Sequence, residues 1–488
     1  MKKFLALALA VIMVLALSVP AWAASITIGS SAETGATDTT EYHYYQLLRA
    51  SIDGTKVTYY LENTTDDTLR SLLDAVTVGG VDLFTFTQSA DGTRWNLTIN
   101  KKSNGEQFTD EDGAAIAAAL NTDAIKAAAI SNNTFAQTAA GGSASTGEIS
   151  QGYYLVTSTL GSKLVVDTLG DVNIATKNEY ITNTKAASKT NMNVGDQVEY
   201  TITVNIPATA VVGETVTVHD TLDSHLAILD ASGAIAATED DYAITAALEG
   251  TPVALSAGIK KAATETFAKS FVITSAMLGK AVVLTYKAEL LSTAADDTGY
   301  VNEVFSSTPT YETAPSDVDV YTFDFDLDKD FTDGSGTEQA TFQLRTTAND
   351  ESTAISFITD STGGYVVADS DDTGASTTIT ATDAVVNIRG LEAGTYYLVE
   401  LTTASGYNLL TSPVEVTITD TTDPTATPVS PSHTVNGTNT AVKVVNNSGT
   451  ELPSTGGIGT TIFYVLGGLL VVFAGVLLIT KTRMNKEQ

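Results

Sequence analysis

The sequence contains no cysteine, so no disulfide can stabilise any part of the chain. It has only four histidines, none of them spaced like metal ligands or a catalytic triad, and no paired carboxylates stand out. We therefore expect no enzyme, no cofactor and no bound metal ion. Basic residues are scarce, 25 against 57 acidic ones, which leaves a net charge of −32. A surface this acidic repels nucleic acid and keeps an exposed protein soluble.

Long uncharged apolar runs occur only at the two ends of the chain. At the N-terminus, Lys2 and Lys3 precede an apolar run from residue 4 to 19, and Ala21-Trp22-Ala23 follows as a small-x-small cleavage site. This pattern is typical of a secretory signal peptide over residues 1–23. A secreted protein without disulfides needs another source of mechanical and proteolytic resistance.

At the C-terminus, a pentapeptide precedes a hydrophobic span and a basic tail, which together occupy residues 457–488. Residues 461–480 are long enough to cross a bilayer as a helix, and the cationic tail favours the inner side. A plain membrane anchor is the alternative to a processed signal. The pentapeptide is Leu452, Pro453, Ser454, Thr455 and Gly456.

The pentapeptide, span and tail, in this order, resemble the cell-wall sorting signal of Gram-positive surface proteins. The resemblance implies that a sortase cysteine attacks the carbonyl of Thr455, releases everything from Gly456 onward and passes the acyl group to an amine. The span is then absent from the mature protein. The implied location is the cell wall, reached from a membrane-tethered precursor.

Between these signals, residues 24–180 indicate a mixed α/β domain. Aromatic and β-branched residues at 56–61 and 152–156 predict strands. Helices are expected over 66–75 and from Thr109 to residue 129, with a break near Asn121.

Residues 181–320 and 321–450 each predict a β-sandwich, because short alternating strands are separated by turn residues. Residues 197–204 alternate polar and apolar side chains. Phe323, Phe325, Leu327 and Lys329 fall on one face of a strand. The fold class is therefore mainly β: a mixed N-terminal domain followed by two β-sandwich domains, which the family resemblance below implies to be immunoglobulin-like.

The whole precursor resembles the major, or backbone, pilins of sortase-assembled Gram-positive pili, whose immunoglobulin-like domains are related to those of collagen-binding surface proteins. The resemblance rests on the sorting signal, on the first and last strands of the two sandwiches, and on Glu400 within Tyr396-Tyr397-Leu398-Val399-Glu400. In that family each immunoglobulin-like domain forms an internal Lys–Asn isopeptide bond without an enzyme. A desolvated lysine attacks the asparagine amide, and a protonated carboxyl shuttles protons.

For the 321–450 domain, the resemblance implies a bond between Lys329 and Asn446, with Glu400 as the acid. Asn447 is the alternative amide, although it points to the opposite face. A solvated lysine at the end of its strand is the alternative reading of Lys329.

For the 181–320 domain, the resemblance implies Lys185, Asp220 and Asn302, with Lys189 as the rival nucleophile. An uncrosslinked domain is the alternative. The first domain has Thr157 where an acid would be needed, so no internal bond is expected there.

The family also uses a lysine near the end of the first domain to join subunits. The stretch Val172-Asn173-Ile174-Ala175-Thr176-Lys177-Asn178 occupies that place, although Ala175 and Thr176 replace the family's Tyr and Pro. Lys177 is therefore the expected acceptor of the Thr455 acyl group, and Lys163 is the nearest rival.

The implied function is the shaft subunit of a covalent surface pilus that supports adhesion. The implied partners are a sortase, further copies of the chain, accessory pilins, peptidoglycan and host surface ligands. A monomeric wall-anchored adhesin or a minor pilin is the first alternative. A wall-anchored secreted enzyme, such as a glycosidase, is the second.

Overall fold

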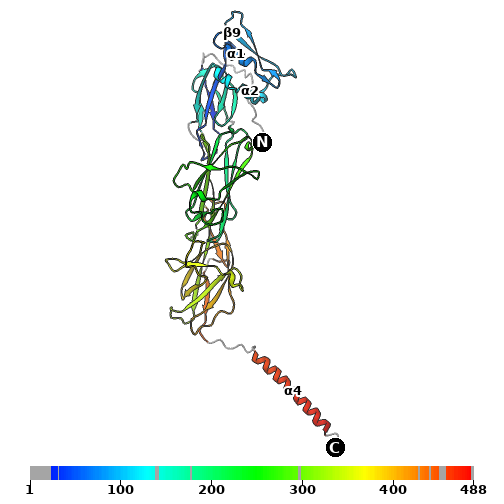
Figure 1. Ribbon diagram of the computed structural model, residues 1–488, viewed down its shortest axis with the longest axis vertical. Coiled ribbons are helices and arrows are strands. Elements are labelled where there is room, and N and C mark those ends of the chain that lie inside the picture. The colour runs from blue at the N-terminus through cyan, green and yellow to red at the C-terminus, as the bar shows by residue number, and fades with distance from the viewer. Residues whose placement is uncertain are drawn as a thin grey trace. The chain divides into compact units, whose positions relative to one another are not determined.

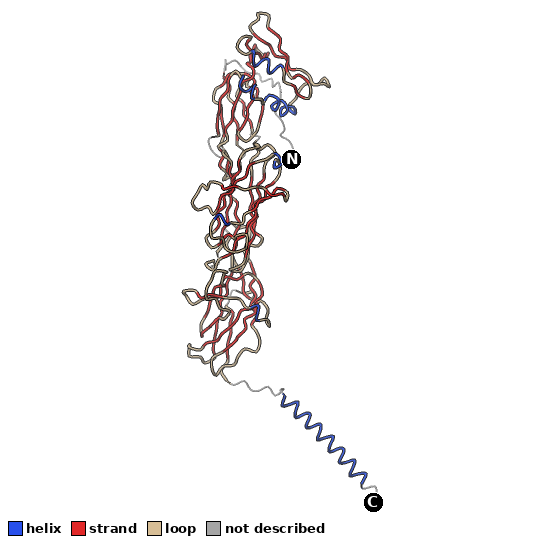
Figure 2. Tube along the Cα trace, viewed as in Figure 1, coloured by secondary structure: helices blue, strands red, loops and turns tan. Residues whose placement is uncertain are grey.

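The computed structural model describes residues 23–30, 32–137, 142–175, 178–294, 298–426, 429–438, 441–449 and 458–484. They belong to two compact units. One comprises the chain up to Thr322 together with Asp423–Pro431, and the other comprises Phe323–Thr422 and the chain from Ser432 onward. Strands dominate both units (Figures 1 and 2), which confirms the mainly β prediction. The predicted signal peptide apart from Ala23, the predicted acceptor Lys177 and the pentapeptide Leu452–Gly456 lie outside the described residues.

The N-terminal part of the first unit is built on a sheet centred on the long strand β4 (Glu41–Asp53). The strand order is β14-β13-β4-β5-β9-β8, and β10 pairs with part of β4. The bounds are β5 Lys56–Glu62, β8 Phe84–Gln88, β9 Arg94–Ile99, β10 Ser131–Ala136, β13 Gly152–Ser158 and β14 Lys163–Asp167. A second, three-stranded sheet consists of β2 Ile26–Gly29, β11 Ser143–Ser145 and β15 Val172–Ile174.

Three short helices supply apolar side chains to the core of this part: α1 (Asp67–Asp74), α2 (Gly113–Leu120) and α3 (Asp123–Ala128). The helix predicted over 66–75 is confirmed by α1. The break predicted near Asn121 is also confirmed, because Thr122 begins a new helix: its hydroxyl accepts a hydrogen bond from the Ile125 N–H at 3.2 Å. The buried helical residues are Leu69, Leu73, Ile116, Ala117, Leu120 and Ile125.

Small elements complete this part of the chain. The strand pairs are β1 (Ala23–Ala24) with β12 (Ile149–Ser150) and β6 (Thr77–Val78) with β7 (Val81–Asp82). A 3-10 turn, η1 (Asp110–Asp112), precedes α2, and the Asp112 carboxylate accepts the Thr109 N–H at 2.7 Å.

The rest of the first unit is a two-sheet sandwich. One sheet has the order β16-β17-β24-β20-β21, with β19 also on β24, and the other has β22-β23-β18-β25-β26-β3, with β27 also on β25. Val198, Tyr200, Ile202 and Val204 of β17 are fully buried, which confirms the alternation predicted over 197–204. The bounds are β3 Thr37–Asp38, β16 Thr182–Ala187, β17 Gln197–Asn205, β18 Thr215–Leu222, β19 Leu226–Ile228, β20 Thr245–Leu248, β21 Thr251–Pro252, β22 Ser256–Ala257, β23 Phe267–Val272, β24 Ala281–Leu290, β25 Tyr300–Ser307, β26 Tyr311–Glu312 and β27 Ser316–Val320, with 3-10 turns η2 Glu239–Asp241 and η3 Ser275–Met277.

The second unit is also a sandwich, with sheets β30-β31-β33-β28-β37 and β32-β29-β34-β35-β36. Phe323, Phe325, Leu327, Lys329 and Phe331 of β28 are buried, and the residues between them are more exposed, so the predicted inner row is confirmed. The bounds are β28 Phe323–Phe331, β29 Gln339–Arg345, η4 Glu351–Thr353, β30 Phe357–Thr359, β31 Tyr365–Val367, β32 Ile379–Thr382, β33 Val385–Leu391, β34 Gly394–Thr402, β35 Val414–Asp420, β36 His433–Val435 and β37 Val442–Asn446.

A single long helix, α4 (Ile458–Met484), follows the second sandwich along the chain. Its segment Ile462–Arg483 has a mean hydropathy of 2.8 and is not buried against protein. By length and composition this segment can cross a membrane, as the sequence predicts.

Within the first unit, a short strand from near the N-terminus extends a sheet of the sandwich. Strand β3 pairs antiparallel with β26, and the Thr39 N–H donates to the Thr310 carbonyl at 2.9 Å. Asp38, only 1% exposed, holds this connection in place. Its carboxylate accepts hydrogen bonds from the Thr40 N–H at 3.0 Å, the Ser30 hydroxyl at 2.9 Å and the Tyr180 hydroxyl at 2.8 Å.

Replacing Asp38 with Ala leaves the buried Thr40 N–H and two half-buried hydroxyls without this acceptor, which costs about 1–3 kcal/mol. We expect the opening free energy of the Thr39 N–H, measured by native-state hydrogen exchange, to fall by this amount. Thr39→Ala is the matched control, because it removes only an exposed hydroxyl that donates to Thr310 at 3.0 Å. Equal effects of the two variants would contradict the role assigned to Asp38.

Candidate cross-linking sites

The first sandwich brings Lys185, Asp220 and Asn302 together in its interior. Lys185 lies on β16 in one sheet, whereas Asp220 on β18 and Asn302 on β25 belong to the neighbouring strands of the other. The side chains of Lys185 and Asp220 are fully buried, and so is Asn302. The Lys185 amine donates to Asp220 Oδ2 and to Asn302 Oδ1. One amine therefore contacts both the carboxyl and the amide.

Burial governs the protonation of this pair. Desolvation lowers the pKa of Lys185 to about 8, although the charge of Asp220 acts in the opposite direction. Desolvation likewise raises the pKa of Asp220, against the effect of Lys185. With a pKa of about 8, about a tenth of the amine is neutral at pH 7, against roughly one part in a few thousand for a solvated lysine. The interior therefore favours a nucleophilic amine beside a protonated acid.

Sequence reasoning missed a fourth member of this site, Tyr286 on β24. Its hydroxyl donates to the Asp220 carboxylate at 3.1 Å and accepts a hydrogen bond from Asn302 Nδ2 at 2.6 Å. In the sequence, Tyr286 continues the alternating row of Val282 and Leu284, so its pattern indicates only a core residue. The hydroxyl's partners lie on distant strands, and no local signal identifies them.

The second sandwich places Lys329, Glu400 and Asn446 around a second interior position. Strand β28, which carries Lys329, pairs in parallel with β37, which carries Asn446, and Glu400 comes from β34 in the opposite sheet. In the register, Lys329 lies opposite Val444 and Phe331 opposite Asn446. Lysine and asparagine are thus one side-chain repeat apart on the same face.

Lys329 is only 1% exposed, which excludes the alternative of a solvated strand-end lysine. Its amine donates to the Asp330 carbonyl at 2.7 Å and lies 3.4 Å from the centre of the Phe331 ring. Burial lowers the pKa of Lys329, opposed chiefly by the charge of Glu400.

The acid and the amide of this site are in direct contact. Asn446 Nδ2 donates to Glu400 Oε2 at 3.0 Å and to the Asn408 carbonyl at 2.7 Å, and the Leu410 N–H donates to the same Glu400 oxygen at 2.8 Å. Glu400 Oε1 and Asn446 Oδ1 are buried and have no hydrogen-bond partner among the described residues. Such atoms are rare in proteins. An amine turned from Asp330 toward these two oxygens would satisfy both.

The rival residues lie in different surroundings. Lys189 is about a third exposed and forms an ion pair with Asp196. Asn447 is exposed and accepts a hydrogen bond from the Thr332 hydroxyl at 3.1 Å. Lys163 is exposed at the start of β14, and the position of Lys177 lies outside the described residues.

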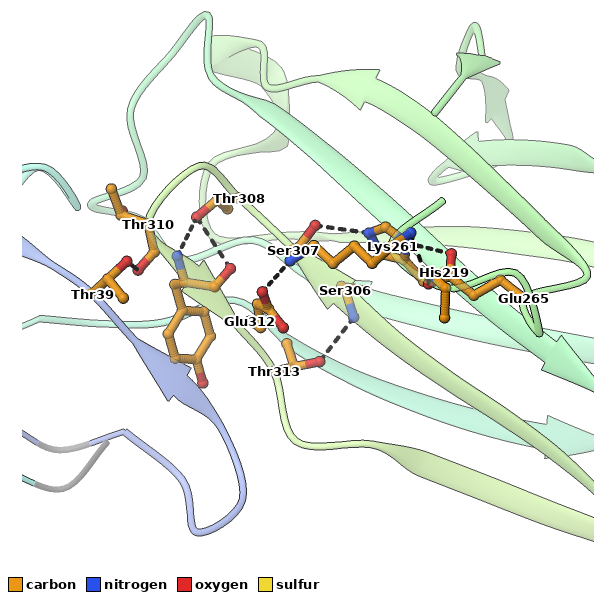
Figure 3. Close-up of polar contacts among 12 residues, drawn as sticks. Thr39, His219, Lys261, Glu265, Ser306, Ser307, Thr308, Thr310, Glu312 and Thr313 are labelled. Carbon is orange, nitrogen blue, oxygen red and sulfur yellow. Dashed lines mark hydrogen bonds and ion pairs between the residues drawn. The ribbon is translucent and has the colours of Figure 1, made fainter. Parts of the chain in front are cut away.

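The expectation that no histidine forms a triad-like cluster is wrong. Figure 3 shows His219 between Glu265 and Ser307: His219 Nδ1 is 2.8 Å from Glu265 Oε2, and Nε2 is 2.9 Å from Ser307 Oγ. The three residues are far apart in the sequence, which is why spacing did not reveal the cluster. His219 is 1% exposed and Ser307 6%, so the hydroxyl is closed to an external substrate.

The contacts of Glu265 indicate what this cluster does. Its Oε1 accepts the N–H groups of Lys261 and Ala262 at 3.0 Å each, and His219 stacks on Phe305. These hydrogen bonds therefore attach the loop that precedes β23 to the outer face of the sheet that contains β18. The described residues contain no group of three potential metal ligands.

Comparison with known proteins places two family models on the C-terminal part of the chain. The prealbumin-like fold domain named SpaA matches residues 325–430, and the LPXTG cell wall anchor motif matches residues 444–487. No curated protein sequence matches the chain. The anchor match and the apolar helix α4 identify a cell-wall-anchored surface protein with a membrane-tethered precursor.

Three solved structures illustrate the fold similarity. The Corynebacterium diphtheriae major pilin SpaA is 16% identical, with 87% of this chain and 100% of that chain covered and a TM-score of 0.48. The T6 backbone pilin of Streptococcus pyogenes is 14% identical, with 89% and 100% covered and a TM-score of 0.41. The group B streptococcus pilus 2b backbone protein is 22% identical, with 55% and 99% covered and a TM-score of 0.37.

Proposed function

We propose that this wall-anchored protein is the shaft subunit of a covalent surface pilus. One observation carries the proposal: each of the two sandwiches has a buried lysine at a site that also contains a carboxyl group and an asparagine. The chain has no cysteine that could supply a disulfide instead. Such sites suit internal cross-links, and internal cross-links suit a fibre under load. The protein's own chemistry would occur once in each domain, so its role is structural rather than enzymatic.

In the first sandwich, the neutral Lys185 amine attacks the side-chain carbonyl carbon of Asn302. The new C–N bond replaces the bond to Nδ2, and one ammonia leaves. Asp220, protonated at the start, gives its proton to the developing oxyanion and then accepts the proton that the attacking nitrogen sheds. A proton from the acid reaches Nδ2, which leaves as ammonia, and the oxygen returns its proton to Asp220 as the carbonyl reforms. The folded core supplies the alignment, because the amine already contacts both groups.

In the second sandwich, Glu400 plays the part of Asp220, and Lys329 attacks Asn446. The Lys329 amine first turns away from the Asp330 carbonyl, to which it donates in the structure. The two orphaned buried oxygens of Glu400 and Asn446 favour this turn, because a buried acceptor without a partner costs about 1–3 kcal/mol.

Both bonds would join the strand that begins a sandwich to one near its end. The Lys185–Asn302 bond connects β16 with β25 across the two sheets, and the Lys329–Asn446 bond connects β28 with β37. A pulling force that enters at the first strand would pass through the covalent bond and leave near the last strand. The strands in between would then carry no tension.

Assembly would follow from the sorting signal. A sortase would cleave after Thr455 and join its carbonyl carbon to the amine of Lys177 in the next copy, and the last subunit would be linked to peptidoglycan. Accessory pilins and host surface ligands are further proposed partners, in support of adhesion. The net charge of −32 disfavours nucleic acid as a partner.

Replacing Glu400 with Ala removes the acid of the second site. We expect the full-length chain to retain one more ammonia than the unmodified protein, as measured by intact mass. Loss of the cross-link should destabilise this sandwich by about 4–5 kcal/mol, the chain-entropy value for a closed loop of roughly 100 residues. Calorimetry and limited proteolysis would report the loss. Glu415→Ala, at an exposed position on the neighbouring strand β35, is the control and should change neither quantity.

The intersubunit bond is tested by blotting wall extracts from producing cells. Cells with the unmodified protein should show a ladder of high-mass polymers, and Lys177→Ala cells should show only monomer. Lys163→Ala is the control, and its ladder should persist. A ladder from Lys177→Ala cells would refute the assignment of Lys177. A lone monomer from unmodified cells would favour the monomeric adhesin over the shaft.

A further inference from the structure

The Tyr286 hydroxyl forms hydrogen bonds with both Asp220 and Asn302 of the first cross-linking site. Among the described residues, no hydrogen bond joins Asp220 directly to Asn302. The hydroxyl donates to both Asp220 oxygens at 3.1 Å and accepts from Asn302 Nδ2 at 2.6 Å. Asn302 Nδ2 is the nitrogen that must depart as ammonia if the proposed cross-link forms, and the inference below rests on that proposed function. A departing amide nitrogen needs a proton, because an amide anion is a very poor leaving group.

We propose that Tyr286 is a catalytic residue that relays a proton from Asp220 to the leaving nitrogen of Asn302. The carboxyl of Asp220 contacts the Lys185 amine, which attacks the Asn302 amide. The Tyr286 phenol contacts the leaving nitrogen, Nδ2, of that amide. Acid, phenol and leaving nitrogen therefore form one chain of hydrogen bonds, in contact with the nucleophile only at its start.

The relay conserves atoms and charge. Attack of the neutral Lys185 amine on Asn302 gives a tetrahedral intermediate. Asp220 gives its own proton to the oxyanion and then takes the proton that the attacking nitrogen sheds. The phenol transfers its proton to Nδ2, whose lone pair is free once the carbon is tetrahedral, and Asp220 reprotonates the phenol oxygen. The C–Nδ2 bond breaks, ammonia leaves, and the hydroxyl on the central carbon returns its proton to Asp220 as the carbonyl reforms, so that Asp220 and Tyr286 regain their starting protonation.

The ring of Tyr286 is held firmly enough for this task. The residue is 2% exposed, and its ring lies 5.3 Å from the rings of both Tyr200 and Phe267, edge-on to the latter. Such packing fixes the ring, so that only rotation of the hydroxyl is needed to reverse the direction of donation.

The second sandwich shows why the relay belongs to one site only. There the acid itself touches the leaving nitrogen, because Asn446 Nδ2 donates to Glu400 Oε2 at 3.0 Å. The second partner of that nitrogen is the Asn408 carbonyl, which can orient the amide but cannot donate a proton. In the first sandwich the acid is Asp220, whose side chain is shorter than that of Glu400. There the Tyr286 phenol connects the acid to the leaving nitrogen.

The test compares Tyr286→Phe with Tyr200→Phe in the full-length chain. Tyr200 is the matched control: its ring centre lies 5.4 Å from the Lys185 amine, against 5.6 Å for Tyr286, but no hydrogen bond joins its hydroxyl to Asp220 among the described residues. Unreacted chain is recovered from inclusion bodies in denaturant and refolded by dilution at acidic pH, where lysine protonation slows the chemistry below the rate of folding. Digestion and mass spectrometry follow the Lys185–Asn302 cross-linked peptide over time.

We expect Tyr286→Phe to slow formation of this peptide on the order of 100-fold or more, the scale of general acid catalysis. Tyr200→Phe should react at the rate of the unmodified chain. The Lys329–Asn446 peptide in the same digests shows that each variant has folded, and its rate should not change. Fluorotyrosine at position 286 keeps the hydroxyl but makes it more acidic, and should speed the reaction several-fold, an effect that a merely structural hydroxyl would not produce.

Equal rates for Tyr286→Phe and the unmodified chain would overturn the relay while leaving the cross-link intact. An unchanged rate with fluorotyrosine, beside a slow Phe variant, would also overturn it and reduce Tyr286 to a positioning residue. Absence of the Lys185–Asn302 peptide from the unmodified chain would instead refute the proposed cross-link itself.

Discussion

The removal of a lysine amine from water is the constraint on which the rest of this molecule depends. A strand that alternates inward and outward side chains would normally have only apolar residues in its inner row, yet Lys329 lies in that row between Leu327 and Phe331. An unpaired ammonium there would be costly. The fold meets this cost by lowering the pKa of the buried lysine and placing an acid and an amide nearby. The same burial that penalises the charge makes the amine reactive.

The two sandwiches reach this result by different routes. In the first, lysine lies in one sheet and asparagine in the other, so a bond would tie the sheets together. In the second, lysine and asparagine lie on adjacent parallel strands, and only the acid comes from the opposite sheet. Both routes would shield the intervening strands from tension, and neither requires cysteine. This offers a physical reason why a secreted, wall-anchored chain can lack disulfides altogether.

Much of this organisation could be predicted from the sequence, because it follows from local patterns. Period-two alternation correctly placed Lys329 on the inner face, and the charge pattern at the C-terminus predicted the span now seen as α4. Spacing alone could not choose between Lys185 and Lys189, and the choice of Lys185 came from family resemblance; burial separates the two lysines. Tyr286 and the His219 cluster depend on strands brought together only by the fold, so no local pattern could reveal them. For the same reason, the pairing of β3 with β26 was not predicted.

The central claim is that both buried lysines become amides of their neighbouring asparagines. The intact mass of the protein, compared with the mass calculated from its sequence after allowance for signal-peptide removal, tests this claim most directly. We predict a deficit of two ammonia molecules, with each missing ammonia traced by digestion to a peptide that joins Lys185 to Asn302 or Lys329 to Asn446. A mass equal to the calculated value, with all four side chains unmodified in the digest, would contradict the account.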